Sequence, residues 1–163
     1  MVQEFDWNET DYSQFRSSLK LVAGVAGIFA GGVLVDYLGH RRSLVTLFAT
    51  LMTVNFAMAM ALRLQLGGLY LAAFEMLLVF IFIAFFAATM RQCWKMIAAT
   101  QFSFTMVWGN IALVIGAAML GPLIEPFGEQ GVLFTLAGFA AMATLIAAGL
   151  KLEDHKAIEA IAD

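Results

Sequence analysis

The feature that most constrains this chain is a series of five long stretches with very little charge. Each is close to the roughly 20 residues that an α-helix needs to cross the apolar core of a bilayer. Water-soluble helices would need a polar face, yet segments such as 76–90 are apolar all round. We therefore expect five transmembrane helices. The stretches cover residues 17–37, 43–62, 67–90, 97–120 and 131–150.

Composition supports a membrane protein and excludes several other classes. Hydrophobic residues make up 62% of the chain, against about 45–50% in a soluble domain. Alternation of period two is absent, which predicts an all-α fold without strands. The nine Lys and Arg residues are scattered and the net charge is -3, so nucleic acid is not an expected partner. The lone Cys93 excludes an intramolecular disulfide and a Cys-based metal site; we expect no metal ion and no cofactor.

Short connections between the stretches predict one bundle without separate domains. We expect an outer polar segment and helix start at 1–16, the five-span bundle at 17–150 and a cytoplasmic tail at 151–163. Asn8, followed by acidic residues, is a candidate N-cap for the first helix. The expected connections are Gly39–Arg42, Arg63–Leu66, Arg91–Lys95 and Gly121–Gln130.

The positions of Lys and Arg predict an orientation, because cytoplasmic loops carry the excess of positive charge. The richer side should be cytoplasmic, with the N-terminus outside and the C-terminus inside the cytoplasmic (inner) membrane. An odd number of spans with an outside N-terminus and no signal sequence leads us to expect at least one further helix upstream. The cytoplasmic group is Arg41, Arg42, Arg91, Lys95, Lys151 and Lys156, and the outer group is Arg16, Lys20 and Arg63.

The segment 31–42 carries the strongest local motif, at the junction of the first two spans. It resembles the signature loop of the major facilitator superfamily, with Val35 and His40 as departures. That resemblance implies a gating latch on the cytoplasmic side. The alternative is a plain, positively charged turn. Gly39 would allow the tight reversal, and Asp36 would accept hydrogen bonds or pair with a cation. The matching residues are Gly32, Leu34, Asp36, Gly39, Arg41 and Arg42.

A second resemblance is narrower. The segments 6–14, 90–91 and 98–102, together with Glu75, are similar to the C-terminal half of the peptide/acetyl-coenzyme A transporter family, which includes AmpG-type muropeptide permeases. The five spans would then be helices eight to twelve of a twelve-helix carrier, a partial major facilitator fold. The resemblance implies a component or fragment of a secondary active transporter that works by alternating access. Proton-coupled uptake of a muropeptide or other anionic compound is the implied activity. The missing N-terminal helices, or a partner subunit, would complete it.

Glu75 is the candidate for proton coupling or substrate orientation. It lies inside an apolar span, where a carboxylate is costly unless it is paired or protonated. The alternative is a pairing carboxylate without a role in turnover, and the sequence leaves both open.

The spacing of charged residues in the first and third spans predicts a partner for Glu75. Lys20 precedes Asp36 by the same sixteen residues that separate Glu75 from Arg91, about 24 Å along a helix. If the first and third spans pack side by side, Lys20 meets Glu75 and Asp36 meets Arg91, which adds Arg91 to the gating loop. The alternative is that Lys20 extends toward the outer surface and Arg91 lies among the cytoplasmic headgroups.

Small and polar residues form two further patterns. The first span carries a stripe with its cations at the outer end, which favours close helix packing; in the alternative, Arg16 and Lys20 attract an anionic solute. In the fourth span, Gln101 is a candidate polar lining residue by resemblance. Asn55 and Asn110 are expected to form interhelical hydrogen bonds. The stripe consists of Arg16, Lys20, Gly24, Gly27 and Gly31.

Three classes of function remain to be compared. The first is the carrier component, with the lipid bilayer, a small solute and protons as partners. The second is a small assembly or scaffold subunit without transport, which would tolerate Glu75→Gln. The third, an intramembrane enzyme, lacks any Gly-x-Ser-x-Gly or His-Glu-x-x-His motif, and we expect no enzymatic activity.

Overall fold

The computed structural model describes residues 9–61, 67–94 and 96–150, and every regular element in this part of the chain is a helix. The all-α class predicted from the sequence is therefore confirmed. The elements are α1 (Glu9–Ala26), the π-helical turn η1 (Gly27–Gly31), α2 (Gly32–Leu38), α3 (His40–Met60), α4 (Gly67–Gln92) and α5 (Ala98–Gly149).

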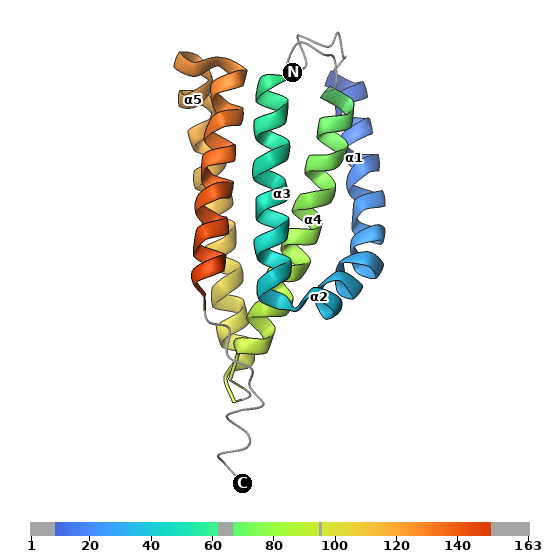
Figure 1. The fold of residues 1–163 in the computed structure, drawn as a ribbon, viewed down its shortest axis with the longest axis vertical. Coiled ribbons are helices and arrows are strands. Elements are labelled where there is room, and N and C mark those ends of the chain that lie inside the picture. The colour runs from blue at the N-terminus through green and yellow to red at the C-terminus, as the bar shows by residue number, and fades with distance from the viewer. Residues whose placement is uncertain (1–8, 62–66, 95, 151–163) are drawn as a thin grey trace.

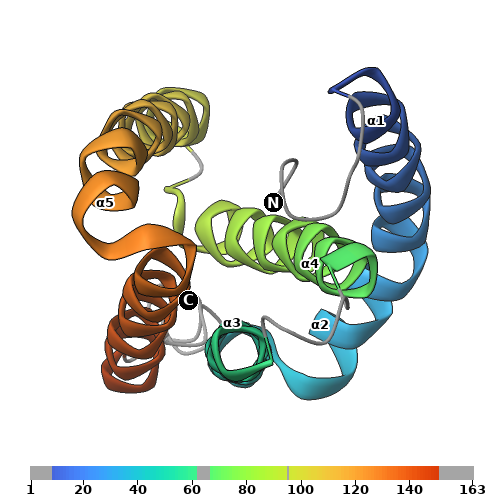
Figure 2. The same ribbon diagram turned by 90° about the horizontal axis from the view of Figure 1, so that it is seen from above.

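The long helices lie side by side with their axes roughly aligned (Figure 1). We call the end with the starts of α1 and α4 the Glu9 end, and the opposite end, with the α2–α3 junction, the Gly39 end. Viewed from above, α4 lies between α1 on one side and α5 on the other (Figure 2). Three helices, α3, α4 and α5, are long and apolar enough to cross a membrane. These apolar helices fit a membrane protein.

The first predicted span, over 17–37, is bent in the structure. The portions Ser13–Ala26 and Phe29–Leu38 meet at 44° and together could form a fourth span. The bend falls at η1, where the helix widens for one turn. Such π-helical turns are a recognised cause of helix kinks, because they interrupt the regular hydrogen-bond ladder. The structure starts α1 at Glu9, directly after the proposed cap Asn8, which lies outside the described residues.

The helix α5 has 52 residues and contains one break. Gly128 has φ 63° and ψ -173°, outside the helical region, and there the chain reverses, so that Figure 1 shows two limbs. The sequence predicted a connection over Gly121–Gln130. Instead, helical structure continues past Pro122 and Pro126 up to Gly128. A glycine is needed at the reversal because positive φ is strained for other residues.

Two other connections differ in position from the predicted ones. Gly39 alone separates α2 from α3, so His40 to Arg42 form the first turn of α3 and not a loop. Similarly, α4 continues to Gln92, so Arg91 belongs to a helix. The predicted connection Arg63–Leu66 and the predicted tail 151–163 lie outside the described residues.

The core has two parts, and α3 contributes to both. Near the Gly39 end, aliphatic residues of α2, α3 and α4 pack with Ala147 of α5. Near the Glu9 end, Met58 and Ala59 of α3 pack with Tyr70 of α4 and Leu133 of α5. Many of the buried positions are alanine, which allows the helix backbones to approach closely.

Candidate functional site

A partly buried ion pair joins α1 to α4 in the half of the bundle nearer the Glu9 end. Arg16 Nε donates a hydrogen bond to Glu75 Oε1 at 2.7 Å. The Glu75 side chain is 5% exposed and the Arg16 side chain is 43% exposed. From Gly67 to Met90, Glu75 is the only charged residue of α4. The pair therefore neutralises the one charge in the apolar stretch from Gly67 to Met90.

Two glycines bring the same helices into close contact further toward the Gly39 end. A Cβ atom built on Gly27 would lie 2.5 Å from Val79 Cγ1 and 2.9 Å from Ile83 Cδ1. A Cβ atom on Gly31 would lie 3.1 Å from Ile83 Cδ1. By contrast, Gly24 has no atom within 4 Å of that position. The glycines of the predicted stripe at 27 and 31 thus serve helix packing.

The two ion pairs predicted from the helix register are wrong. Glu75 pairs with Arg16, one turn before the expected Lys20, and Lys20 is exposed. No ion pair joins Asp36 to Arg91 in the described part of the chain, and Asp36 is exposed. The register argument assumed one continuous α-helix from 20 to 36. The π-helical turn and the 44° bend remove that continuity, so equal spacing in sequence no longer gives equal spacing along the two packed segments.

The motif residues at the Gly39 end connect three helices. Gly39 has φ 78° and ψ 152°, which confirms that the reversal uses the conformational freedom of glycine. Arg41 Nη2 donates to the carbonyl oxygen of Ala148 in the last turn of α5. Carbonyls in a last turn have no partner within the helix, and the helix dipole favours a cation there. Arg41 therefore ties α3 to α5.

The other basic contact at this end involves α4. Arg91 Nη1 lies 3.4 Å from His40 Nδ1, and because a guanidinium can only donate, the ring nitrogen accepts. The arginine predicted for the gating loop thus reaches that loop, but through His40 and not through Asp36. Arg42 is exposed, and Gly32 has open space where a Cβ would lie.

Gln101, predicted to be a polar lining residue, makes a local contact at the start of α5. Its Oε1 accepts a hydrogen bond from the backbone N–H of Trp94 at 2.8 Å, which stabilises the connection between α4 and α5.

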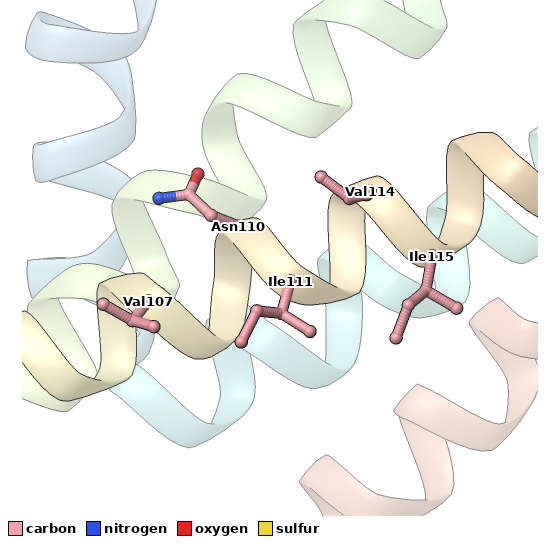
Figure 3. A pocket seen from close by; sticks show the side chains of 5 residues that line it. All are labelled: Val107, Asn110, Ile111, Val114 and Ile115. Atoms are coloured by element: carbon pink, nitrogen blue, oxygen red, sulfur yellow. The ribbon is translucent and has the colours of Figure 1, made fainter.

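The two asparagines of the spans differ. Asn55 is fully buried and accepts from Tyr70 Oη at 2.9 Å, which confirms the predicted interhelical bond. Asn110 forms no such bond in the part of the chain that the structure describes. It lines an open apolar pocket of about 330 Å³ on the first limb of α5 (Figure 3). The remaining lining residues are Val107, Ile111, Val114 and Ile115.

Three residues at these contacts were missed in the sequence. Tyr70 and Gln130 hold helices together, since Gln130 Nε2 donates to the carbonyl of Ala59 at 3.0 Å. Both are polar side chains next to apolar stretches, a signal for interhelical hydrogen bonds that applies to them as to Asn55. His40 was treated as a departure from a motif, although an imidazole can also accept from an arginine.

Comparisons with known proteins give no relative on which the identification of this site could rest. The chain matches no protein-family model, no curated protein and no solved structure.

Proposed function

We propose that the chain is an integral membrane bundle of five spans. The α1–α2 segment would form one bent span, α3 and α4 one each, and the limbs of α5 one each. The length of α5 supports this division, since 52 residues extend about 78 Å as a straight helix. A bilayer core is about 30 Å thick. The break at Gly128 divides that length into two limbs that each suffice for one crossing.

The proposed orientation follows from basic residues at the Gly39 end. Arg41, Arg42 and Arg91 gather there. Positive charge near the ends of spans favours the cytoplasmic side. The Gly39 end would therefore face the cytoplasm, with the N-terminus outside and the C-terminus inside.

The proposed activity is that of a component of a secondary active transporter that couples solute movement to protons by alternating access. The observation that carries this proposal is the Arg16–Glu75 ion pair. Charged side chains within membrane spans are costly, and they mark substrate, ion or proton pathways more often than packing sites. The Glu75 side chain is 5% exposed, whereas the Arg16 side chain that pairs with it is 43% exposed.

The contacts at the Gly39 end support the same proposal. Arg41 bonds to the end of α5 and Arg91 lies against His40, so the two contacts join α3 to both of its neighbours. An ion pair toward one end and a polar latch at the other are the elements that alternating access requires. The resemblance of segment 31–42 to the major facilitator loop adds to this support.

The proposed partners are the missing N-terminal helices or a partner subunit. Carriers of this kind bind solute between two related halves, and five spans fall short of two halves. In the first limb of α5, most side chains over 103–122 are exposed. Helices from a second half would have room to pack along that limb.

The competing proposal is a scaffold subunit without transport. It differs in one respect that can be measured: in a scaffold, the ion pair and the Gly39 end are independent. In a carrier, opening at one end must change the other. Ser43 is suited to report on the Gly39 end, because it is 0% exposed and its Oγ lies 3.4 Å from the carbonyl of Leu34.

The test uses Ser43→Cys in a Cys93→Ser background, labelled in membranes by a maleimide. Glu75→Gln should change the labelling rate of this cysteine several-fold, although the two sites lie toward opposite ends. Glu125→Gln is the matched control, since it removes an exposed carboxylate at the α5 reversal, and it should leave the rate unchanged. Equal rates in all three proteins would contradict the carrier proposal and favour the scaffold.

A further inference from the structure

The first limb of α5, residues 98–127, contributes no buried residue to the core of the described chain. The buried residues of α5 all lie on its second limb, after the break at Gly128. Seen from above, the first limb lies at the edge of the bundle (Figure 2). The pocket on this limb is lined by residues of the limb alone (Figure 3). Its face is therefore open to a partner from outside the described part of the chain.

Exposed residues on the pocket face recur at alternating intervals of four and three residues. This spacing keeps one face of a helix turned toward a parallel helix along its length. The six side chains are small, β-branched or polar, which lets two helix backbones approach closely. We call these residues the seam: Ser103, Val107, Asn110, Val114, Ala117 and Gly121.

Asn110 is the seam residue that lipid cannot satisfy. It lies about 18 Å from the start of the limb and about 26 Å from its end, so a limb that spans the bilayer places the amide deep in the apolar core. The Asn110 side chain forms no hydrogen bond within the described residues. An acyl chain offers neither a donor nor an acceptor, whereas a second helix can offer both.

We propose that this seam binds the same seam of a second copy of the chain. Copies of one membrane protein insert with the same orientation, because the same basic residues select the cytoplasmic side. Two copies can then be related by a two-fold axis perpendicular to the membrane, which places every seam residue at the depth of its equivalent. Asn110 of one copy therefore meets Asn110 of the other.

The Asn110 amide is complementary to itself. It carries N–H donors and a carbonyl acceptor, so two such amides can donate to each other across the two-fold axis. A single Asn in the seam of a parallel helix pair also fixes the register and the number of helices. Like charges do not meet in this arrangement, since no residue from 96 to 124 is charged.

The pocket beside Asn110 fits the side chains of such a partner helix. Val107, Ile111, Val114 and Ile115 surround a hollow of about 330 Å³. Because β-branched side chains are stiff at χ1, the hollow has a stable shape. The valines of the second copy can insert into it as knobs into holes.

The limb is long enough for a specific contact. Residues 98–127 extend about 45 Å, and one third of the surface of a helix of that length is roughly 500 Å². Two copies would bury roughly 1,000 Å² in total, which reaches the lower bound for a specific interface. The dimer should therefore form reversibly and dissociate on dilution in lipid.

This inference rests on the membrane bundle of the proposed function and names its partner subunit. Carriers of this kind bind solute between two related halves, and the second copy would supply the second half. Dimerisation itself does not require transport, so the two can be tested separately.

Cysteine cross-linking of the full-length chain in membranes tests the position of the seam. Val114→Cys in the Cys93→Ser background should give a covalent dimer on oxidation with iodine, because equivalent seam residues lie within the Cα separation that a disulfide spans. Ala112→Cys is the matched control, since Ala112 is also exposed but lies on the opposite side of the helix. Equal cross-linking of both cysteines, or none at Val114→Cys, would overturn the proposal.

The dimer fraction in lipid vesicles measures the contribution of Asn110. Energy transfer between copies that carry donor and acceptor dyes at the N-terminus gives the dissociation constant as lipid is added. Asn110→Ala should raise this constant about 3- to 30-fold, and Asn110→Gln should raise it less. An unchanged constant in Asn110→Ala would contradict the proposal. A wild-type chain that stays monomeric even at high protein density would do so too, and would show that lipid covers the seam.

A pair of bulky substitutions separates the two sides of the limb. Ala117→Leu adds bulk within the seam and should raise the dissociation constant several-fold. Ala112→Leu adds the same bulk to the opposite side and should leave it unchanged. Both alanines are exposed in the single chain, so neither substitution disturbs its core. Equal effects of the two would refute the seam as the contact.

The outcome is separate from that of the carrier proposal. If the chain dimerises through the seam but Glu75→Gln leaves Ser43→Cys labelling unchanged, the dimer stands and the carrier mechanism fails. If labelling changes but the chain is monomeric in lipid, the carrier stands and the second copy is not its partner.

Discussion

Arg16 Nε and Glu75 Oε1 lie 2.7 Å apart, and this contact joins α1 to α4 across 59 positions of sequence. It is the ion pair that the structure assigns to the one charged residue between Gly67 and Met90. The asymmetry of the pair, with a shielded carboxylate and a half-exposed guanidinium, determines what each substitution should do.

Arg16→Gln should destabilise the protein more than Glu75→Gln. Removal of Arg16 leaves a shielded carboxylate without its cation, at a cost of about 3 kcal/mol, typical of a broken buried pair. Removal of the Glu75 charge leaves a guanidinium that can contact water, so its cost should be about 1 kcal/mol or less. Unfolding by a denaturing detergent measures both. The reverse order would contradict the assigned burial.

Gly27→Ala should destabilise the contact between α1 and α4. Its methyl group would lie 2.5 Å from Val79 Cγ1, and such overpacking costs about 1–3 kcal/mol. Gly24→Ala is the matched control on the same helix, since nothing lies within 4 Å of its Cβ position. It should be neutral or stabilising by up to about 1 kcal/mol. Equal effects of the two substitutions on the unfolding midpoint would refute the packing role of Gly27.

Gly39→Ala should strain the reversal between α2 and α3. The φ of 78° and ψ of 152° lie in a region that side chains disfavour, and the expected cost is about 1–3 kcal/mol. Gly32→Ala provides the comparison, because Gly32 has helical angles and open space around its Cβ position. Thermal unfolding in detergent should separate the two variants. No difference between them would argue against this turn geometry.

Arg41→Gln should loosen the Gly39 end. It removes the bond to the carbonyl of Ala148, so that Ser43→Cys in the Cys93→Ser background should react with maleimide several-fold faster. Arg42→Gln removes the same charge from an exposed neighbour and should leave the rate close to that of the parent. If both substitutions accelerate labelling equally, the local positive charge controls the labelling rate, and the hydrogen bond from Arg41 to Ala148 does not.

The helices could be predicted from the sequence because their cause is local. A long apolar run without a polar face defines a helix by itself, and α3 and α4 lie close to the predicted 43–62 and 67–90. The bend at η1 could not be predicted in this way, because residues 27–31 fit an ordinary α-helix as well as a π-helical turn. Likewise, a connection was predicted over Gly121–Gln130, yet helical structure continues past Pro122 and Pro126 up to Gly128.

The sequence predicted which residues belong to the candidate site better than it predicted which of them contact each other. Glu75 stands out because a charge in an apolar stretch needs a partner, and Arg16 and Lys20 were both available on α1. The two lie one turn apart on the same face of α1, so choosing between them required the axial position of α1 relative to α4. The hydrogen bond from Arg41 to Ala148 could not be predicted from the sequence, because its acceptor is a backbone carbonyl, which sequence patterns do not mark.

The ion pair and the latch have their proposed roles only if lipid surrounds α3, α4 and α5. The most direct measurement is the partition of the expressed chain between membrane and buffer, followed by sedimentation of the purified protein. The chain should stay in membranes through an alkaline carbonate wash and should need detergent to remain dispersed. A folded monomer in buffer without detergent would contradict the membrane bundle, and with it the transport function.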